Sequence, residues 1–578
     1  MLGRHHRAFR AISSHDAVMT VTAAPWVTRN EVARLPRLAV WAFCLTWLVP
    51  GLVGRDPWRH ADVTSFAVMS AMAEGRSSWW HPVIAGVPVE VGLLPHWLGA
   101  GAIVLLGELL GPVLAVRLVF GALLGVTMAA IWYATFHLAR TEAAQPAALP
   151  FGGEAPPVDY ARALADGALL AMLATLGLLQ LGHETTEEAL QLAAVAAFLW
   201  ATAAAPWRGF SARLVVVISL PVLAGSGAPW LAVSVGLVGA LICARSSYEG
   251  ARQLVPWVFA AVVAAAATTT VLSTWTWSVS LQPSWAEFGQ ILRQWSWFLW
   301  PSWPLALWTI WRWRAHWASR HVALPQGVAL CVIASSVLLG GDDRTLMLAV
   351  PGMAILAAFA LPTFQRAASA AIDWFSIFFF SASALFVWFM YVAMQTGWPA
   401  KPAANVAKLA VGFEPPFSPS ALALGMMGTC VWLALVRWRT ERRMHPLWKS
   451  LVLPAGGVVL CWLLLMTLWL PLLDYARSYR PVVSKLLPHL GDPAKCVAVT
   501  GAGTSLLASL EVMTVHRIDG RPASAAEGSC TTRIHVVKSD REGLPATLPG
   551  GWELQTRVAR PTDRDEQLGV YRRLPETR

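Results

Sequence analysis

The sequence predicts an α-helical polytopic membrane protein that ends in a small soluble α/β domain. Of its 578 residues, 56% are hydrophobic and only 13% are charged, whereas about a quarter of the residues of an ordinary soluble domain are charged. Apolar runs that are long enough to cross a hydrocarbon core of about 30 Å as helices recur between residues 38 and 472. Residues 473–578 have ordinary charge density and no spanning run, so we expect them to form a separate domain.

Hydropathy predicts about thirteen spans, near residues 38–54, 114–138, 163–182, 188–206, 212–226, 228–245, 254–279, 291–311, 324–340, 345–364, 373–395, 421–437 and 450–472. Basic residues gather in the loops that this count places on the side of the N-terminus, among them Arg140, Arg208 and Arg245. This positive-inside pattern predicts a cytoplasmic tail at residues 1–37 and a periplasmic C-terminal domain, in a bacterial inner membrane. It also accounts for the net charge of +11, so we expect no nucleic-acid partner. The apolar run near 96–112 is predicted to be an interfacial helix on the outer side.

The cysteines agree with this topology. Five of them fall in apolar spans, where they are small core residues: Cys44, Cys243, Cys331, Cys430 and Cys461. Cys496 and Cys530 lie in the terminal domain, which favours a disulfide in an oxidising compartment over a coincidental pair of free thiols. That domain alternates strand-like runs such as "KCVAVTG" with the helical run "TSLLASLEVM". The chain has no Walker motif, GxGxxG or zinc-finger spacing, which argues against an ATPase or a cofactor enzyme.

The first outer loop carries the candidate chemistry. Its stretch "GRDPWRHADVTSFAVMSAMAEGRSSWWHPVIAGVPVEVGLLPHW" gathers charges that would each cost about 2.5 to 3.5 kcal/mol at mid-bilayer, so it must lie outside the membrane. The carboxylates of Asp62 and Glu90 could act as general bases on a hydroxyl group. Arg55, Arg59 and Arg344 are outer-face cations suited to hold a phosphate. The simpler interpretation is that all of these groups are solvated loop charges and surface ion pairs.

This stretch resembles the first periplasmic loop of the aminoarabinose transferase and protein-mannosyltransferase-like group of GT-C glycosyltransferases. Later segments are similar to that family in the same order along the membrane region. "LGHETTEEALQLAAVAAF" resembles the second outer loop, with Glu187 at its acidic position, and "DDRTLMLAVPGMAILAAFALP" places Arg344 at a basic position. "FLWPSWPLALWTIWRWR" resembles another of its spans.

The resemblance implies a GT-C-like domain at residues 38–472 with an outer catalytic loop at 54–112. It implies an inverting transfer of a sugar from a polyprenyl-phosphate donor, such as undecaprenyl phosphate, to a lipid A-like or other periplasmic acceptor. Nothing in the sequence selects the sugar or the acceptor. In this interpretation Asp62 and Glu90 are catalytic, and four residues bind substrate: Arg55, Arg59, Glu187 and Arg344.

Three departures from the family pattern stand out. Val91, Gly92 and Leu93 replace its "KPP", Ala61 replaces the first member of an acidic pair, and Ser226 replaces a lysine. In the family those lysines help to hold the lipid phosphate. Their loss leaves that task to arginines, or indicates a different donor or lost activity.

Two further alternatives stay open. His60, His81 and His96 could hold a divalent metal with Asp62 or Glu90; their spacing fits no established metal motif, which favours a structural role for them, and a divalent metal stays an open alternative. A lipid or polysaccharide transporter would fit the interrupted segment Gly225–Pro229, although we detect no inverted repeat. A non-catalytic scaffold is the remaining class.

Overall fold

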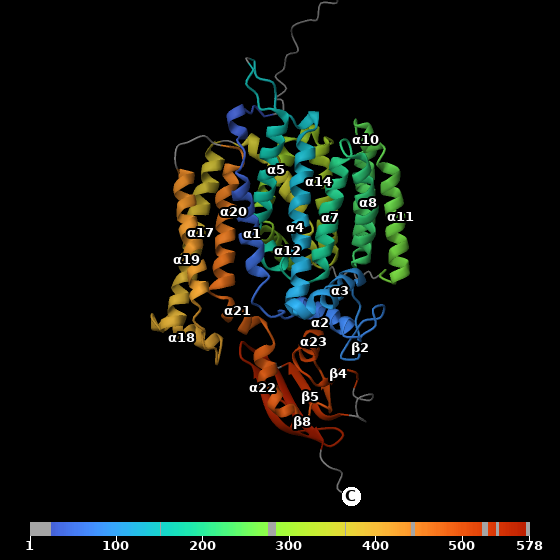
Figure 1. Cartoon of the computed structure of the whole chain (residues 1–578), viewed down its shortest axis with the longest axis vertical. Helices are drawn as coiled ribbons and strands as arrows, with labels where there is room; N and C mark the ends of the chain where they lie inside the picture. Colours follow the sequence, from blue (N-terminus) through green and yellow to red (C-terminus); the bar gives the residue numbers. More distant parts are fainter. Residues whose placement is uncertain are drawn as a thin grey trace, which may run out of the picture.

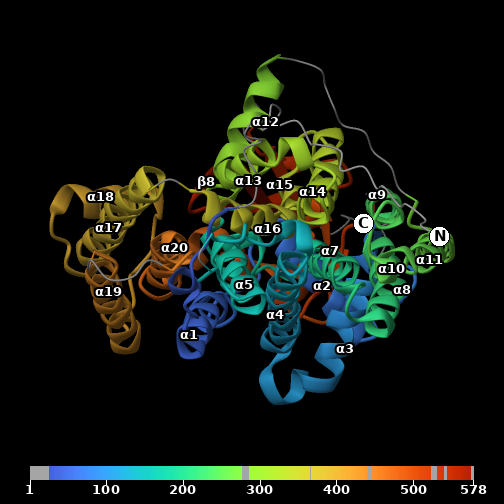
Figure 2. The same ribbon diagram turned by 90° about the horizontal axis from the view of Figure 1, so that it is seen from above.

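The structure is a computed structural model that describes residues 25–150, 152–275, 285–364, 366–440, 446–522, 530–538 and 543–573. Most of its helices stand side by side in one bundle, and a sheet with a few helices lies beyond one end of that bundle (Figure 1). Seen from above, the helices occupy a broad area, with α17 and α19 at one edge and α11 at the opposite edge (Figure 2).

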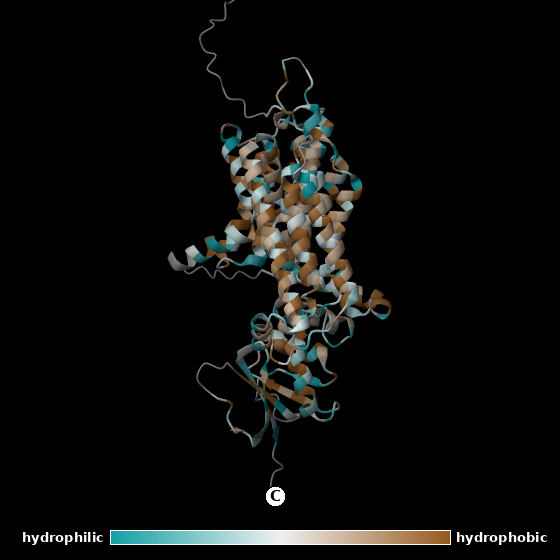
Figure 3. Ribbon diagram, turned by 90° about the vertical axis from the view of Figure 1, so that its left-hand side faces the viewer, coloured by the Kyte–Doolittle hydropathy of each residue, from teal (hydrophilic) through white to brown (hydrophobic). Residues whose placement is uncertain are grey.

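The helices of the bundle and its loops are α1 (Arg37–Leu48), α2 (Ala61–Ala73), α3 (Leu93–Leu110), α4 (Pro112–Ala139), α5 (Pro157–Ala174), α6 (Leu178–Leu181), α7 (Glu187–Ala204), α8 (Gly209–Gly225), α9 (Pro229–Ala244), α10 (Glu249–Arg252), α11 (Val255–Leu272), α12 (Trp285–Phe298), α13 (Ser302–Arg312), α14 (Arg320–Leu338), α15 (Asp343–Met347), α16 (Val350–Ala360), α17 (Arg366–Thr396), α18 (Ala400–Leu409), α19 (Pro419–Thr440) and α20 (Lys449–Thr467). In the described part of the chain, seven helices are long and apolar enough to cross a membrane, and several shorter apolar helices accompany them. Their surfaces are largely hydrophobic along the bundle (Figure 3).

Every one of the predicted spans coincides with at least one helix of this bundle, so the structure confirms the predicted class of polytopic helical membrane protein. Individual residues determine where a predicted span is divided into two helices. The span predicted at 291–311, for example, is divided between α12 and α13, and Pro301 lies at the break. Proline cannot donate the backbone hydrogen bond that a continuous helix needs there.

The first loop forms a layer across the lower end of the bundle in Figure 1. It contains α2, the short hairpin of β1 (Val83–Ile84) and β2 (Val87–Pro88), and α3. By length and composition α3 could cross a membrane, yet it lies beside α2 at the end of the bundle that faces the sheet (Figure 1). This is the position expected of the predicted interfacial helix.

The C-terminal unit begins with α21 (Leu470–Arg477) and α22 (Arg480–Leu490) and contains α23 (Thr504–Met513) and one six-stranded sheet. The strands are β3 (Cys496–Thr500), β4 (Arg517–Asp519), β5 (Cys530–Lys538), β6 (Thr547–Leu548), β7 (Trp552–Arg560) and β8 (Asp563–Arg573), in the order β4-β3-β5-β8-β7-β6. The predicted disulfide is present: Cys496 is bonded to Cys530, which faces it across the parallel β3–β5 pair at a Cα distance of 4.5 Å.

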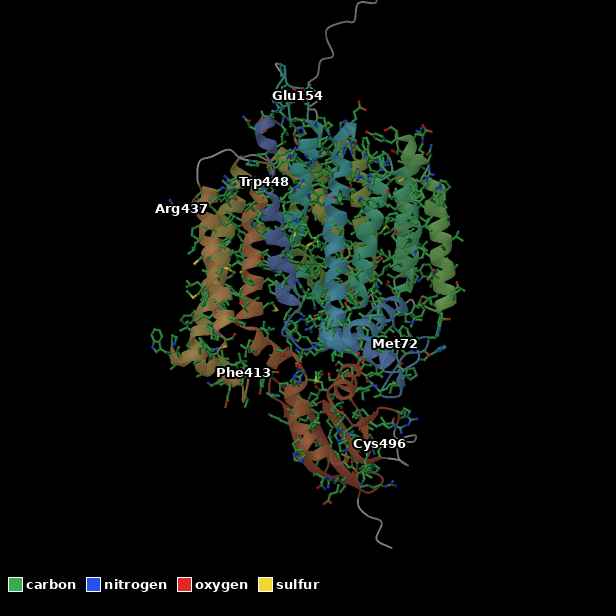
Figure 4. All side chains as sticks on the ribbon, in the orientation of Figure 1. Met72, Glu154, Phe413, Arg437, Trp448 and Cys496 are labelled. Atoms are coloured by element: carbon green, nitrogen blue, oxygen red, sulfur yellow. A yellow bond between two sulfur atoms is a disulfide. The ribbon has the colours of Figure 1, made fainter. Side chains whose placement is uncertain are left out.

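The C-terminal unit and the first loop lie at the same end of the bundle, as the predicted topology requires. The Gly520 N–H donates to the Ala85 carbonyl at 2.8 Å, and Arg480 pairs with Asp56 at 2.5 Å. Met72 and Cys496 are near this end, whereas Glu154 and Arg437, from loops predicted on the other side, lie at the opposite end (Figure 4).

Candidate functional site

Asp62 is the centre of a buried ion pair in the first turn of α2. Its Oδ2 accepts from Arg55 Nη1 at 2.9 Å and from the Trp58 N–H at 3.0 Å. Its Oδ1 accepts from both the N–H and the hydroxyl of Thr185, each at 2.9 Å. The side chain is fully buried. Asp62 therefore ties the turn after α1 to the loop between α6 and α7.

The charge of Asp62 is maintained by its surroundings. Burial alone would raise its pKa, but the nearby Arg55 and Arg117 and the N–H groups of Thr185 and Trp58 hold the pKa below its ordinary value. The carboxylate is thus ionised, and each of its two oxygens already accepts two hydrogen bonds. A substrate hydroxyl reaches it only if Thr185 or Trp58 withdraws.

Arg55, which the sequence analysis expects to bind phosphate, is buried in the structure. Its guanidinium side chain is 2% exposed. Besides Asp62, it donates from Nε to the Gly51 carbonyl at 3.0 Å and from Nη2 to the His183 carbonyl at 2.7 Å. In this arrangement Arg55, buried against three acceptors, supports the loop from within, and its predicted role in phosphate binding stays a prediction. Arg59 is half-buried beside it, and its N–H donates to the Arg477 carbonyl at 2.9 Å.

A second polar centre surrounds Arg344, in the first turn of α15. Its Nη2 pairs with Glu184 Oε2 at 2.5 Å, and its Nη1 lies 3.4 Å from the Thr186 hydroxyl and 3.8 Å from Glu188 Oε2. Although burial alone would lower the pKa of Arg344, the carboxylates of Glu184 and Glu188 raise it. Its side chain is 19% exposed, so it remains accessible from one side.

The loop His183–Glu188, which we call the HETTEE loop, joins these two centres. Thr185 binds Asp62 on one side of the loop, and Glu184 binds Arg344 on the other. The His183 ring packs between Trp47 and Trp462, with ring centroids 4.7 and 4.8 Å away. The segment "HETTEE" between two apolar runs is the sequence signal that could have identified Glu184 and Thr185.

Two adjacent cavities open beside this loop and share Glu187 and Gly227 in their walls. The first measures about 460 Å³ and is lined also by Glu188, Gln191 and Asp342. The second measures about 970 Å³ and has a different wall, which includes His81, Glu90 and Thr274. Glu90 is exposed at this second cavity. Glu187 thus lies at the junction of the two cavities, where the sequence analysis expected a substrate-binding residue.

Glu188 was not identified from the sequence, yet it lines the first cavity, and its Oε2 lies 3.8 Å from Arg344 Nη1. Its Oε2 is buried and accepts no hydrogen bond within the described part of the chain. Asp342 and Thr345 line the same cavity next to Arg344. The acidic pair that precedes Arg344 in "DDR" is the sequence signal that could have identified Asp342 as a residue of the site.

Two glycines allow the segments that form the cavity walls to lie close to one another. A Cβ at Gly227, which has a φ of +93°, would lie 2.7 Å from Glu187 Oε2, and a Cβ at Gly92 would lie 2.4 Å from the Ser226 carbonyl oxygen. Gln191 Nε2 donates to the same Ser226 carbonyl at 2.6 Å. At position 226, where the family has a lysine, a buried serine hydroxyl donates back to Val222 at 2.6 Å.

Asp62 and Glu90 are predicted to share one cavity; Glu90 lines the larger of the two cavities described above, whereas Asp62 is fully buried and lines neither of them, so the shared site stays a prediction. The three histidines do not gather either. His96 is buried in α3 against the Gly92 carbonyl, and His81 is exposed at the larger cavity. The one group with metal-ligand spacing among the described residues is Cys496, Asp519 and Cys530, and its two sulfur atoms are joined in the disulfide.

Comparison with known proteins adds structural relatives. No protein-family model and no curated protein sequence matches the chain. ArnT from Cupriavidus metallidurans bound to undecaprenyl phosphate superposes with a TM-score of 0.59 and 14% identity, over 92% of this chain and 97% of that chain. ArnT from the same organism in the apo state gives a TM-score of 0.58 and 12% identity over the same shares. The similarity spans both the bundle and the C-terminal unit.

Proposed function

From the GT-C fold that this chain shares with the ArnT structures, we propose that it is an integral membrane glycosyltransferase. It transfers a sugar from a polyprenyl-phosphate donor to a lipid or other acceptor at the membrane face that bears the C-terminal unit. The observation that carries the proposal is the fold match over 92% of the chain to a protein bound to undecaprenyl phosphate. The polar cavities at that end of the bundle support it.

In this proposal Arg344 contacts the donor phosphate. Its guanidinium is partly exposed, its neighbours Asp342 and Thr345 line the smaller cavity, and a planar guanidinium suits bidentate contact with phosphate oxygens. Because Val91 and Ser226 stand where the family has lysines, Arg344 carries more of this binding than its counterpart would. Phosphate binding replaces the long contact with Glu188, while Glu184 holds the arginine in place.

Glu188 is the carboxylate that we place against the acceptor hydroxyl. A general base needs a free acceptor oxygen within reach of the proton that it removes. Glu188 lines the smaller cavity, and its buried Oε2 meets that condition once phosphate binding replaces its contact with Arg344, which also places the base next to the phosphate that leaves. Glu90 and Glu187 line the route to it from the larger cavity.

Asp62 remains the candidate base of the sequence analysis, and its role depends on a movement of the HETTEE loop. In the closed arrangement described here it positions Thr185 and therefore the whole loop. If phosphate binding moves that loop, Asp62 becomes accessible. The assignments of the general base to Glu188 and to Asp62 can be distinguished by stability, because replacing Asp62 should also destabilise the fold.

The test is sugar transfer by the purified full-length protein in lipid nanodiscs, with a panel of polyprenyl-linked sugars and lipid A-like acceptors. Glu188→Gln should abolish transfer without lowering thermal stability, whereas Arg344→Gln should abolish transfer and also lower thermal stability, because it leaves the buried Glu184 without its partner. Glu108→Gln and Arg314→Gln remove exposed charges outside the two cavities and should leave transfer unchanged. Activity in Glu188→Gln with loss in Asp62→Asn would move the catalytic role to Asp62. No transfer from any donor, with polyprenyl-phosphate binding retained, would support the scaffold, and lipid movement across the bilayer without transfer would support a transporter.

A further inference from the structure

A third cavity lies at the end of the bundle opposite to the candidate site. It measures about 570 Å³ and is formed by α1, α4 and α5. Figure 2 shows these three helices as neighbours at the margin of the bundle. Trp41, which lines the cavity, is 65% exposed and Tyr133 is 50% exposed, so the groove opens outward toward the surrounding lipid.

The wall of this groove is apolar and aromatic along its length. Trp132 stacks on Phe136 with ring centroids 5.6 Å apart, and Leu45 and Leu48 from α1 face the same space. Gly125 of α4 also lines it, and a Cβ added there would meet nothing within 4 Å. This is a surface that a hydrocarbon chain can cover.

The rim of the groove is basic. Arg34, Arg37 and Arg162 line its end at the start of α1 and α5. Asp159 pairs with Arg34 at 2.9 Å and lies 3.7 Å from Arg162. The rim thus carries three arginines, two of which lie close to Asp159. A second carboxylate, Asp166, lies deeper in the wall, where it accepts from the Trp132 indole N–H at 2.8 Å.

We propose that this groove binds an anionic phospholipid, with its phosphate at the arginine rim and an acyl chain along the aromatic wall. Basic pockets between membrane helices bind anionic head groups, and each arginine near the surface adds to that attraction. The donor lipid of the proposed function does not suit this rim, because its phosphate belongs at the opposite end of the bundle. The groove itself is a separate cavity, and only the exclusion of the donor lipid rests on the proposed function.

Native mass spectrometry of the purified full-length protein with phosphatidylglycerol tests this inference. Gly125→Leu fills the groove and should abolish specific binding. Gly101→Leu, at another helical glycine with open space around it, should leave binding unchanged. The double variant Arg37→Gln with Arg162→Gln should weaken binding about thirtyfold. The matched double variant Arg208→Gln with Arg245→Gln removes the same charge from two other exposed loop arginines and should not weaken it.

Further ligands identify the source of the phosphate. Phosphatidylcholine should bind more weakly than phosphatidylglycerol, and inorganic phosphate should not displace the lipid. Equal binding in Gly125→Leu, equal binding of the two phospholipids, or displacement by inorganic phosphate would each overturn the proposal. Displacement of phosphatidylglycerol by undecaprenyl phosphate at equal concentration would also overturn it, by assigning the groove to the polyprenyl carrier.

Discussion

At the scale of single residues, the Asp62–Arg55 pair shows why a membrane protein keeps charges in its interior. Removing two charges from water is costly, so such a pair persists only where further hydrogen bonds satisfy both groups. Asp62 has those bonds from Trp58 and Thr185, and Arg55 from two backbone carbonyls. The pair therefore specifies one arrangement of the loops at this end of the bundle.

Replacing Asp62 by Asn should lower the free energy of unfolding by roughly 3 to 5 kcal/mol, because it leaves Arg55 charged and buried without its partner. Thermal unfolding of the purified protein measures this. The control is Asp159→Asn, which breaks an ion pair whose arginine is 64% exposed, and such pairs contribute about 1 kcal/mol or less. Equal stability of the two variants would contradict the structural role of Asp62.

A second prediction at this scale concerns pH. Burial between two tryptophans lowers the pKa of His183 from 6.5 to about 4. Between these values the unfolded chain binds a proton that the folded chain does not, so stability falls as the pH decreases through this window, by roughly 1.4 kcal/mol per pH unit. Asp62, with its lowered pKa, adds to the loss only below its ordinary value of 3.8.

The measurement is unfolding of the wild type and of His183→Gln between pH 7 and pH 4. The free energy of unfolding of the variant should depend less steeply on pH, by the slope that corresponds to about one bound proton. His489→Gln, which alters an exposed histidine in the C-terminal unit, should retain the slope of the wild type. A slope that is unchanged in His183→Gln would show that other groups govern the acid sensitivity.

At the scale of elements, the turn between α8 and α9 shapes both cavities of the candidate site. Gly227 in this turn has a φ of +93° and leaves no space for a side chain beside Glu187. The turn and α7 are also joined by the hydrogen bond from Gln191 to Ser226. The short connection thus sets the width of the junction between the cavities.

Gly227→Ala should therefore destabilise the protein by about 1 to 3 kcal/mol through backbone strain, and it should also weaken donor binding, because the new methyl group displaces Glu187. Gly397→Ala is the matched control, since Gly397 has a φ of +73° but nothing within 4 Å of an added Cβ. Unfolding and binding of a polyprenyl-phosphate lipid are measured on both. Normal binding in Gly227→Ala would show that this turn does not limit the site.

At the scale of the whole molecule, the C-terminal unit holds the first loop against the bundle. Arg76 pairs with Glu511 of α23, and the Ala85 N–H donates to the same carboxylate at 2.7 Å. Val87 and Val89 pack at the edge of a hydrophobic cluster that contains residues of both α2 and the sheet. The disulfide between β3 and β5 stabilises the platform on which this contact depends.

Thiol labelling of intact cells tests the side of the membrane on which this platform lies. In a variant that retains only Cys496 and Cys530, we expect no labelling before reduction and labelling by an impermeant maleimide after it. Periplasmic disulfides behave in this way because that compartment is oxidising. Labelling by a permeant reagent alone, without reduction, would place the C-terminal unit inside the cell. A variant that retains only Cys461, in α20, is the control for an unpaired thiol within the bundle.

The sequence by itself determined the helical membrane class, the positions of the spans and the disulfide, because apolar length, loop charge and cysteine location are local properties. The resemblance carried by "HETTEE" and "DDR" led to Glu187, which lines both cavities, and to Arg344, whose neighbours Asp342 and Thr345 line one of them. Only the tertiary structure decided which charges face a ligand. Asp62 and Arg55 are buried against each other, whereas Glu188 lines a cavity beside Arg344, since these environments are created by Thr185 and Trp58 on one side and by α15 on the other. Burial and hydrogen-bond partners are provided by segments that are distant in the chain. Hydropathy and motif spacing along one sequence do not predict which distant segments come into contact.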